Sequence, residues 1–237
     1  MQIHAGRNSS IPFTAIGVLF GHAFDKAVIL VARRWRFLII GFAVAYASLV
    51  LYAPAGILAS IGLFLYWIYS ALADAIRLDD PNYRMTASKA TRLFAVQFVL
   101  GLVERVLFLN WIAFAVAVVP GAWLLTKMIA APILAAASAQ DVDQIFVTST
   151  RLTNNNFWQS LTVLIGVRGV FFGAFFLGGL SVPVAIAALK TLPALLEAPL
   201  FVLIVAACAA TFCYVTQSQM LVYVLWKRAL DKASATS

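Results

Sequence analysis

Residues 157–180 read FWQSLTVLIGVRGVFFGAFFLGGL and contain a single charged residue, Arg168. A helix needs about 20 apolar residues to cross the ~30 Å hydrocarbon core of a bilayer. A backbone surrounded by lipid must also satisfy its own hydrogen bonds, which a helix does. This run therefore predicts a transmembrane helix.

The composition of the whole chain agrees with this interpretation. Of its 237 residues, 63% are hydrophobic and 11% are charged, whereas a soluble domain averages about 45–50% and about 25%. Such a chain cannot cover itself with polar groups, which excludes an ordinary soluble enzyme, a disordered chain and a disulfide-stabilised secreted module. The net charge of +8 is spread too thinly for a nucleic-acid track, so we expect no nucleic-acid partner.

Five further apolar runs predict additional spans. Turn residues separate several of them, such as Pro54 with Gly56 and Pro120 with Gly121, and Pro183 ends one run. The six predicted spans cover about residues 37–54, 57–76, 93–119, 123–137, 157–180 and 199–226. We therefore expect an all-α fold, a polytopic bundle of six transmembrane helices in a single integral membrane domain over residues 1–237.

The basic residues predict the orientation of the bundle. With the N-terminus inside, thirteen Lys and Arg residues lie on the inner side and only Lys190 lies in an outer loop. This is a strong positive-inside bias, so both termini are expected in the cytoplasm. A five-span arrangement arises if the third span begins after Arg105 and continues through Pro120. It would place Lys227 and Arg228 outside, which the charge rule disfavours.

Two shorter stretches are apolar on one face and polar on the other. Residues 14–34 and 141–152 repeat apolar side chains at helical spacing, and each lies just before a predicted span on the cytoplasmic side. We interpret both as amphipathic helices in the headgroup layer, with Trp35 and Trp158 as aromatic residues at the cytoplasmic interface. The alternative is that they pack against other helices of the same protein.

Four charged residues fall inside the predicted spans, namely Glu104, Arg105, Lys127 and Arg168. An ionisable group at mid-bilayer costs at least about 2.5–3.5 kcal/mol, so each must face protein or water. Glu104 and Arg168 both lie 11 residues into spans that start at the cytoplasmic face, which predicts that they pair. Lys127 lies seven residues past Pro120, nearer the outer face, and is expected to snorkel. These charges either hold helices together or line a substrate or ion pathway.

Two smaller features concern helix packing. Gly169 and Gly173 form a GxxxG pattern in the fifth span, which allows the close approach of another helix. Gln217, Ser218 and Gln219 interrupt the last span. We expect these three polar side chains to face the bundle or a partner rather than lipid.

The sequence contains no pattern typical of catalysis or metal binding. His4 and His22 are isolated, and Cys208 and Cys213 share one apolar run without CxxC spacing. No nucleophile–His–carboxylate set, P-loop or GxGxxG motif is present. We therefore predict no enzymatic activity, no cofactor and no metal.

One stretch of the sequence resembles a known family. Residues 147–158 read VTSTRLTNNNFW and are similar to a recurring stretch in the membrane domain attached to some glycerophosphodiester phosphodiesterases, and in related small bacterial inner-membrane proteins of unknown function. The resemblance extends over residues 119–166, and residues 13–36 look like the first interfacial helix of that family. The matching positions are Pro120, Gly121, Ala131, Pro132, Ser149, Leu152, Thr153, Asn156, Phe157 and Trp158.

This resemblance implies a multi-span helical fold in a bacterial inner membrane, without an assigned catalytic role. The chain has no room for the soluble phosphodiesterase domain, so we do not expect that activity. The prediction of the membrane spans is independent of the resemblance, because it depends on apolar run length and on the basic residues alone.

Two functional classes are compatible with these features. We expect a non-enzymatic multi-pass inner-membrane protein that binds membrane lipids, anionic ones included, or other membrane proteins, a second copy included. The interfacial helices and the basic inner face favour this function. The alternative is a small transporter or channel-like protein that uses the intramembrane charges. An enzyme acting on lipid ranks third, because no acid–base pair lies at an interface.

Overall fold

The structure, a computed structural model, describes residues 11–36, 39–40, 43, 53–78, 80–108, 111–189 and 194–235. All regular secondary structure in these ranges is helical, which confirms the all-α prediction. The predicted span 37–54 lies mostly outside the described residues. The helices are α1 (Phe13–Arg33), α3 (Ala53–Arg77), α4 (Ala87–Phe108), α5 (Trp111–Lys127), α6 (Ala131–Ala137), α7 (Val142–Asn154), α8 (Phe157–Leu189) and α9 (Ala194–Ala235).

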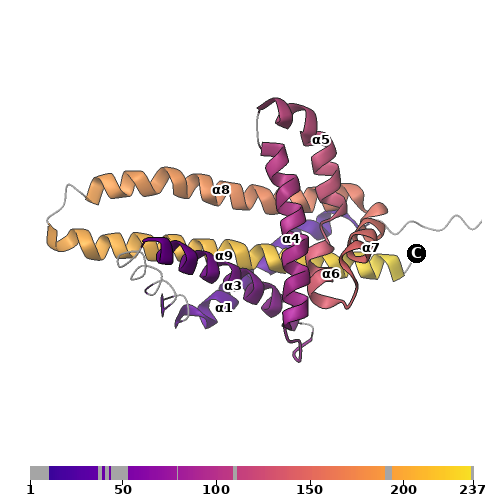
Figure 1. Cartoon of the computed structure of the whole chain (residues 1–237), viewed down its shortest axis with the longest axis horizontal. Coiled ribbons are helices and arrows are strands. Elements are labelled where there is room, and N and C mark those ends of the chain that lie inside the picture. Colours follow the sequence, from indigo (N-terminus) through magenta and orange to yellow (C-terminus); the bar gives the residue numbers. More distant parts are fainter. Residues whose placement is uncertain are drawn as a thin grey trace, which may run out of the picture.

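The two longest helices, α8 and α9, define the long axis of the molecule (Figure 1). They lie side by side and antiparallel, and α1 and α3 also pack against α9. α4 and α5 form an antiparallel hairpin that runs across this axis, while α6 and α7 connect the hairpin to the start of α8. The buried core is thus built around the second half of α9.

Five helical stretches in the described part of the chain are long and apolar enough to cross a membrane. They are Phe13–Arg33, Pro54–Arg77, Val118–Ala137, Phe157–Gly178 and Ala206–Ala235. Large apolar side chains on their outer faces, such as Val18, Leu58 and Phe176, are exposed. Exposed apolar surface on this scale indicates contact with lipid, so the fold is that of a membrane-embedded protein.

The predicted span 93–119 is not one helix. α4 ends at Phe108, and α5 begins at Trp111 and runs back through Pro120, where the turn was expected. A proline removes one backbone hydrogen bond, and a helix in apolar surroundings tolerates this loss when neighbouring groups compensate.

The predicted span 123–137 is also divided. α5 ends at Lys127, a turn covers residues 128–130, and α6 begins at Ala131. Pro132 lies in the first turn of α6, where its missing N–H costs nothing. The end of α5 and α6 together still make up the candidate span Val118–Ala137, and Lys127 is the last residue of α5.

The helix predicted in the headgroup layer at residues 14–34 is α1, and it packs along α9. Ile16, Ala23 and Ala27 are buried, whereas Val18 and Ile29 are exposed. The outer face of α1 also carries exposed His22 and Asp25, so it is of mixed polarity. α1 thus packs within the protein through one face, and its position in the headgroup layer stays a prediction.

The stretch predicted as a second interfacial helix, residues 141–152, forms α7. α7 packs against α5, α6 and α9. Its buried face contains Ile145, Ser149 and Thr153, so two of its three buried residues are hydroxyl residues. α7 therefore also packs within the protein, and its buried face makes hydrogen bonds as well as apolar contacts.

The polar residues of α9 face the bundle, as predicted. Gln217, Ser218 and Gln219 are all buried. The Gln217 side-chain amide donates to the carbonyl of Ala71 on α3 at 3.1 Å, and that of Gln219 donates to the carbonyl of Val167 on α8 at 3.4 Å. α9 is thus hydrogen bonded to both neighbouring helices.

Candidate functional site

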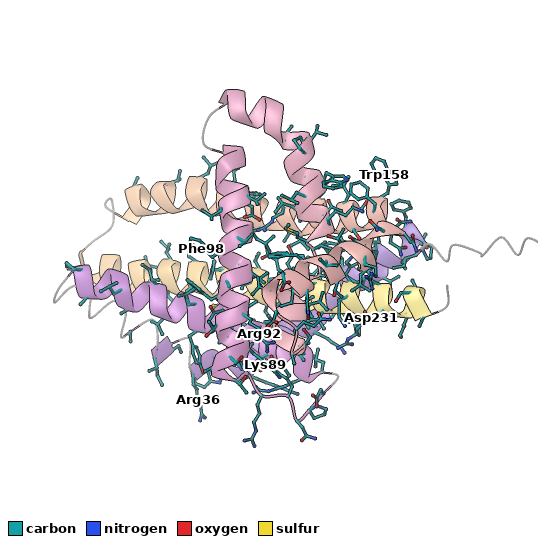
Figure 2. The ribbon with its side chains drawn as sticks, turned by 45° about the vertical axis from the view of Figure 1, so that its right-hand side comes forward. Arg36, Lys89, Arg92, Phe98, Trp158 and Asp231 are labelled. Atoms are coloured by element: carbon teal, nitrogen blue, oxygen red, sulfur yellow. The ribbon has the colours of Figure 1, made fainter. Side chains whose placement is uncertain are left out.

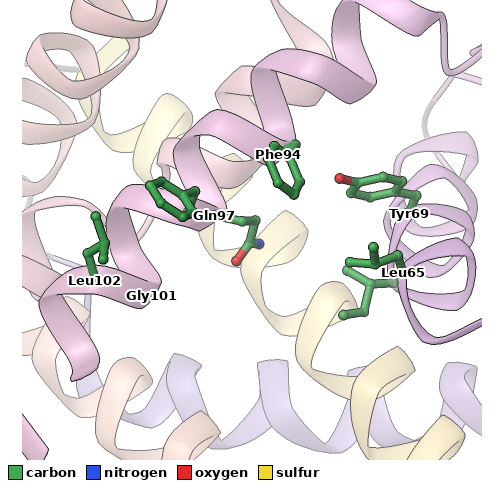
Figure 3. A pocket seen from close by; sticks show the side chains of 8 residues that line it. Leu65, Tyr69, Phe94, Gln97, Gly101 and Leu102 are labelled. Carbon is green, nitrogen blue, oxygen red and sulfur yellow. The ribbon is translucent and has the colours of Figure 1, made fainter. Parts of the chain in front are cut away.

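A groove of about 430 Å³ lies between α3 and α4 (Figure 3). It forms because the two helices have different partners: α4 packs against α5 and α6, whereas α3 packs against α9. Gly101 leaves additional space, since a Cβ atom there would meet no other atom within 4 Å. The residues that line the groove are Leu65, Ile68, Tyr69, Phe94, Gln97, Phe98, Gly101 and Leu102.

The groove is apolar and open to the outside. Phe94 and Phe98 stack on each other with ring centroids 6.4 Å apart, yet 52% and 59% of their surfaces remain exposed. Gln97 and Tyr69 bring the polar atoms of the lining side chains, and Figure 3 shows the Gln97 amide directed into the space between the helices. Such a surface fits a hydrocarbon chain better than a polar solute.

The predicted pair of Glu104 and Arg168 is confirmed. Arg168 Nη2 donates to Glu104 Oε1 and forms a salt bridge between α8 and α4. The two side chains are 35% and 28% exposed. Glu104 lies three residues beyond Gly101, so the ion pair fastens α4 to α8 beyond the far end of the groove. The side chain of Arg105 lies outside the described residues.

The expectation that Lys127 snorkels outward is wrong, because Lys127 is 8% exposed. Its Nζ donates to Asn154 Oδ1 and lies 5.8 Å from the ring centroid of Trp123 and 5.4 Å from that of Phe157. Its carbonyl accepts hydrogen bonds from Ser149 at 2.8 Å and from a second α7 hydroxyl. Since α5 continues through the expected turn, Lys127 returns to the start of α8 and fastens α5 there.

The asparagine run at residues 154–156 connects separate parts of the fold. Asn156 is 3% exposed, and its Oδ1 accepts a hydrogen bond of 2.9 Å from the Ile11 N–H. We call Lys127, Ser149, Thr153, Asn154 and Asn156 the α7–α8 junction. Sequence reasoning missed this junction, although hydroxyl and amide residues in a strongly apolar chain were a usable signal, because buried polar groups require partners.

No described helix of the chain packs closely on Gly169 or Gly173, so the close approach of another helix to this GxxxG pattern stays a prediction. A Cβ atom at either position would meet nothing within 4 Å. The glycine of α8 that is in close contact is Gly166, where an added Cβ would lie 2.7 Å from Cζ of Phe20. α1 touches α8 at this point and otherwise follows α9.

Both predicted interface tryptophans are exposed, Trp35 on 53% and Trp158 on 68% of their surfaces. Trp35 lies beside the guanidinium of Arg36, which is 5.4 Å from the ring centroid. Trp158 contacts Phe157 edge to face. Such exposure suits a lipid headgroup region, and their position at the cytoplasmic interface stays a prediction.

Basic residues gather at the end of the groove where α3 leads into α4 (Figure 2). Arg34 Nη2, just past the end of α1, lies 2.7 Å from Asp74 Oδ2 on α3. Arg77 Nη1 lies 3.1 Å from Asp74 Oδ1. Figure 2 shows Arg36, Lys89 and Arg92 in the same part of the molecule, with Phe98 further along α4. One carboxylate is therefore shared by two arginines.

The connection between α3 and α4 is held in place by Tyr83. Its hydroxyl donates to the Ala136 carbonyl at 2.9 Å, its carbonyl accepts from Arg77 Nε at 3.1 Å, and Lys89 Nζ lies 4.4 Å from its ring centroid. Burial raises the pKa of Tyr83 above its ordinary value, and the charges of Arg77 and Arg92 partly oppose this shift. Arg92 Nη1 also donates to the Gln140 carbonyl at 2.9 Å.

Within the described residues, no three His, Cys, Asp or Glu side chains are grouped so that they could hold a metal ion. No family model, curated protein or solved structure matches the chain. The resemblance over residues 119–166 therefore stays a prediction. The chemistry available at the candidate site is that of an apolar groove next to a basic surface.

Proposed function

We propose that this chain is a non-enzymatic multi-pass membrane protein that binds a lipid, with one hydrocarbon chain in the groove between α3 and α4. The observation that carries the proposal is the groove itself, which is apolar, open and lined by exposed Phe94 and Phe98. Ligand sites of this kind combine an apolar lining with few polar groups. Here the lining side chains bring only Gln97 and the Tyr69 hydroxyl as polar groups.

The charges support lipid binding over the transport of a polar solute. A transport pathway needs polar or charged side chains facing a cavity that is open to water. Glu104 and Arg168 are instead paired with each other, and Lys127 is bonded to Asn154. The first contact holds α4 to α8, and the second holds α5 to the end of α7, so both have a structural role.

We further propose that both ends of the chain lie on the cytoplasmic side of a bacterial inner membrane, with an even number of crossings, six in the count from the sequence. Ile11 bonds to Asn156 at the start of α8, and Trp226 near the end of α9 donates to Ser160 Oγ at 3.2 Å. Ile11 and the last third of α9 are therefore both bonded to residues at the start of α8. Reporter fusions to the two tails test this, and tails on opposite sides would contradict it.

The groove is tested by filling it. Gly101→Leu places a side chain in open space on the groove wall, so the helix is not strained and the ligand loses its room. Gly173→Leu on α8 is the matched control, because a Cβ atom there also meets nothing within 4 Å. We expect purified Gly101→Leu protein to retain less lipid per chain than the wild type by mass spectrometry. Equal retention in both variants would refute lipid binding in the groove.

A further inference from the structure

Two polar side chains line the groove without hydrogen-bond partners in the described part of the protein. Neither the Tyr69 hydroxyl on α3 nor the Gln97 amide on α4 is hydrogen bonded to another residue that the structure describes. Neither group is fully enclosed by protein atoms. Gln217 and Gln219 on α9, by contrast, donate to backbone carbonyls of neighbouring helices. The groove therefore presents polar groups that the fold itself does not use.

Helical spacing places both groups on the groove faces of their helices. Tyr69 lies four residues after Leu65 on α3, and Gln97 lies three residues after Phe94 and four before Gly101 on α4. Residues three and four apart share one face of a helix. Figure 3 shows the Tyr69 hydroxyl directed from α3 toward α4, and the Gln97 amide directed into the space between the two helices. The two groups thus reach the same space from opposite walls.

The depth of these groups suits the layer in which acyl chains are attached to a lipid. The segment between α3 and α4 carries exposed Asp80 and Arg84, so it belongs in water or among headgroups. Tyr69 lies eight residues before Arg77, the last residue of α3, or about 12 Å along the helix axis. Gln97 lies ten residues into α4, or about 15 Å. Headgroups take up roughly 5–8 Å on each side of a bilayer, which puts both groups near the upper end of the acyl chains.

At this depth the partners of Tyr69 and Gln97 must come from the ligand. Hydrocarbon accepts no hydrogen bond, and an amide or hydroxyl without a partner in apolar surroundings is costly. The Gln97 amide and the Tyr69 hydroxyl can both donate. The ester carbonyls of a diacyl glycerolipid are acceptors, and each is joined directly to an acyl chain. A lipid of this class therefore satisfies both donors while its chain covers Phe94 and Phe98.

We infer that the groove recognises a diacyl glycerolipid through its ester carbonyls, to which the Gln97 amide and the Tyr69 hydroxyl donate, while one acyl chain lies between α3 and α4. This inference rests on the proposed function and adds the chemical group by which the lipid is bound. A chain gains little by leaving the bilayer for an equally apolar groove. The two hydrogen bonds therefore decide which lipids the groove retains.

The test uses the full-length protein in bilayers of equal parts diacyl and diether phosphatidylcholine, followed by extraction in detergent and native mass spectrometry. The two lipids share their headgroup and chain length, and only the diacyl lipid has ester carbonyls. We expect the wild type to prefer the diacyl lipid by about fivefold for each hydrogen bond. Gln97→Met and Tyr69→Phe nearly keep the size of the side chain and remove its donor. Each should lower the preference about fivefold at unchanged total lipid.

Matched controls separate the possible outcomes. Gln144→Met on α7 and Tyr66→Phe on α3 change exposed side chains outside the groove lining and should keep the wild-type preference. Equal retention of both lipids by the wild type, or an undiminished preference in Gln97→Met and Tyr69→Phe, would overturn the ester contact and leave the proposed function standing. Undiminished lipid in Gly101→Leu would overturn the proposed function itself.

A free fatty acid also carries a carbonyl and an acyl chain, so it requires a separate measurement. Palmitic acid added to the same bilayers in an amount equal to the diacyl lipid should leave that lipid bound to the wild type. Replacement of the diacyl lipid by palmitic acid would assign the groove to fatty acids and overturn the glycerolipid.

Discussion

The α7–α8 junction and the pair formed by α3 and α4 use polar residues in opposite ways. At the junction, the Ser149 and Thr153 hydroxyls donate to the Lys127 carbonyl of α5, the Asn156 amide oxygen accepts from Ile11, and the Lys127 amine donates to Asn154 of α7. Between α3 and α4, large apolar side chains stay exposed, and basic side chains collect at one end. Buried and satisfied polar groups specify a fold, whereas open apolar surface beside charge is available to a ligand.

The largest effect is expected from cutting the ion pair that holds α4 to α8. Glu104→Gln leaves the Arg168 charge without its partner in a surrounding that we propose to be lipid, and should lower the free energy of unfolding by about 3 kcal/mol. Arg168→Gln should cost a similar amount. The double variant should show a coupling above about 1 kcal/mol, measured by unfolding in mixed micelles. Asp143→Asn, which changes an exposed carboxylate on α7, is the control, and additive effects of the two single variants would contradict the pair.

A smaller effect tests the junction. Asn156→Ala removes the acceptor of the Ile11 N–H and should lower the free energy of unfolding by about 1–2 kcal/mol. Asn155→Ala is a matched control, because the neighbouring Asn155 is exposed. Thermal unfolding in detergent measures both variants. If the two variants lose the same stability, the junction does not hold the start of α1.

The smallest effect concerns Tyr83, which orders the segment between α3 and α4. Tyr83→Phe removes the hydrogen bond to the Ala136 carbonyl and should cost about 1 kcal/mol at neutral pH. Burial keeps the phenol of the folded protein protonated above its ordinary pKa of 10.0. The contribution of the Tyr83 phenol to the free energy of unfolding is therefore fully present below pH 10. It is lost as the pH rises through the raised pKa, because Tyr83 ionises at a lower pH in the unfolded chain than in the folded protein.

The loss of stability at alkaline pH provides the measurement for the Tyr83 prediction. Unfolding curves of the wild type above about pH 10 should show a fall in stability that is weaker in Tyr83→Phe. Tyr66→Phe changes a largely exposed tyrosine of α3 and should keep the wild-type curve. An identical alkaline loss in Tyr83→Phe and the wild type would show that Tyr83 is not the group responsible.

The candidate site was only partly predictable. The pairing of Glu104 with Arg168 followed from the high cost of a lone charge in lipid, and it holds although the boundaries of the third span were wrong. The groove could not be predicted, because it forms where α3 packs against α9 while α4 packs against α5 and α6. The contact of Gly166 with Phe20 was equally hidden, since a glycine pattern does not say where another helix crosses.

The amino-acid sequence by itself determined that this protein is helical and apolar enough for a membrane, because run length, charge density and the need for internal hydrogen bonds are local properties. It also determined which residues would be costly without partners, such as Arg168 and Gln217. Only the tertiary structure decided that helix α5 continues through Pro120 and that Lys127 bonds to Asn154. It also decided that Arg34, at the end of α1, pairs with Asp74 on α3 near the end of the groove. These features depend on which helix faces meet, and each face has several apolar partners of nearly equal free energy, between which local sequence cannot choose.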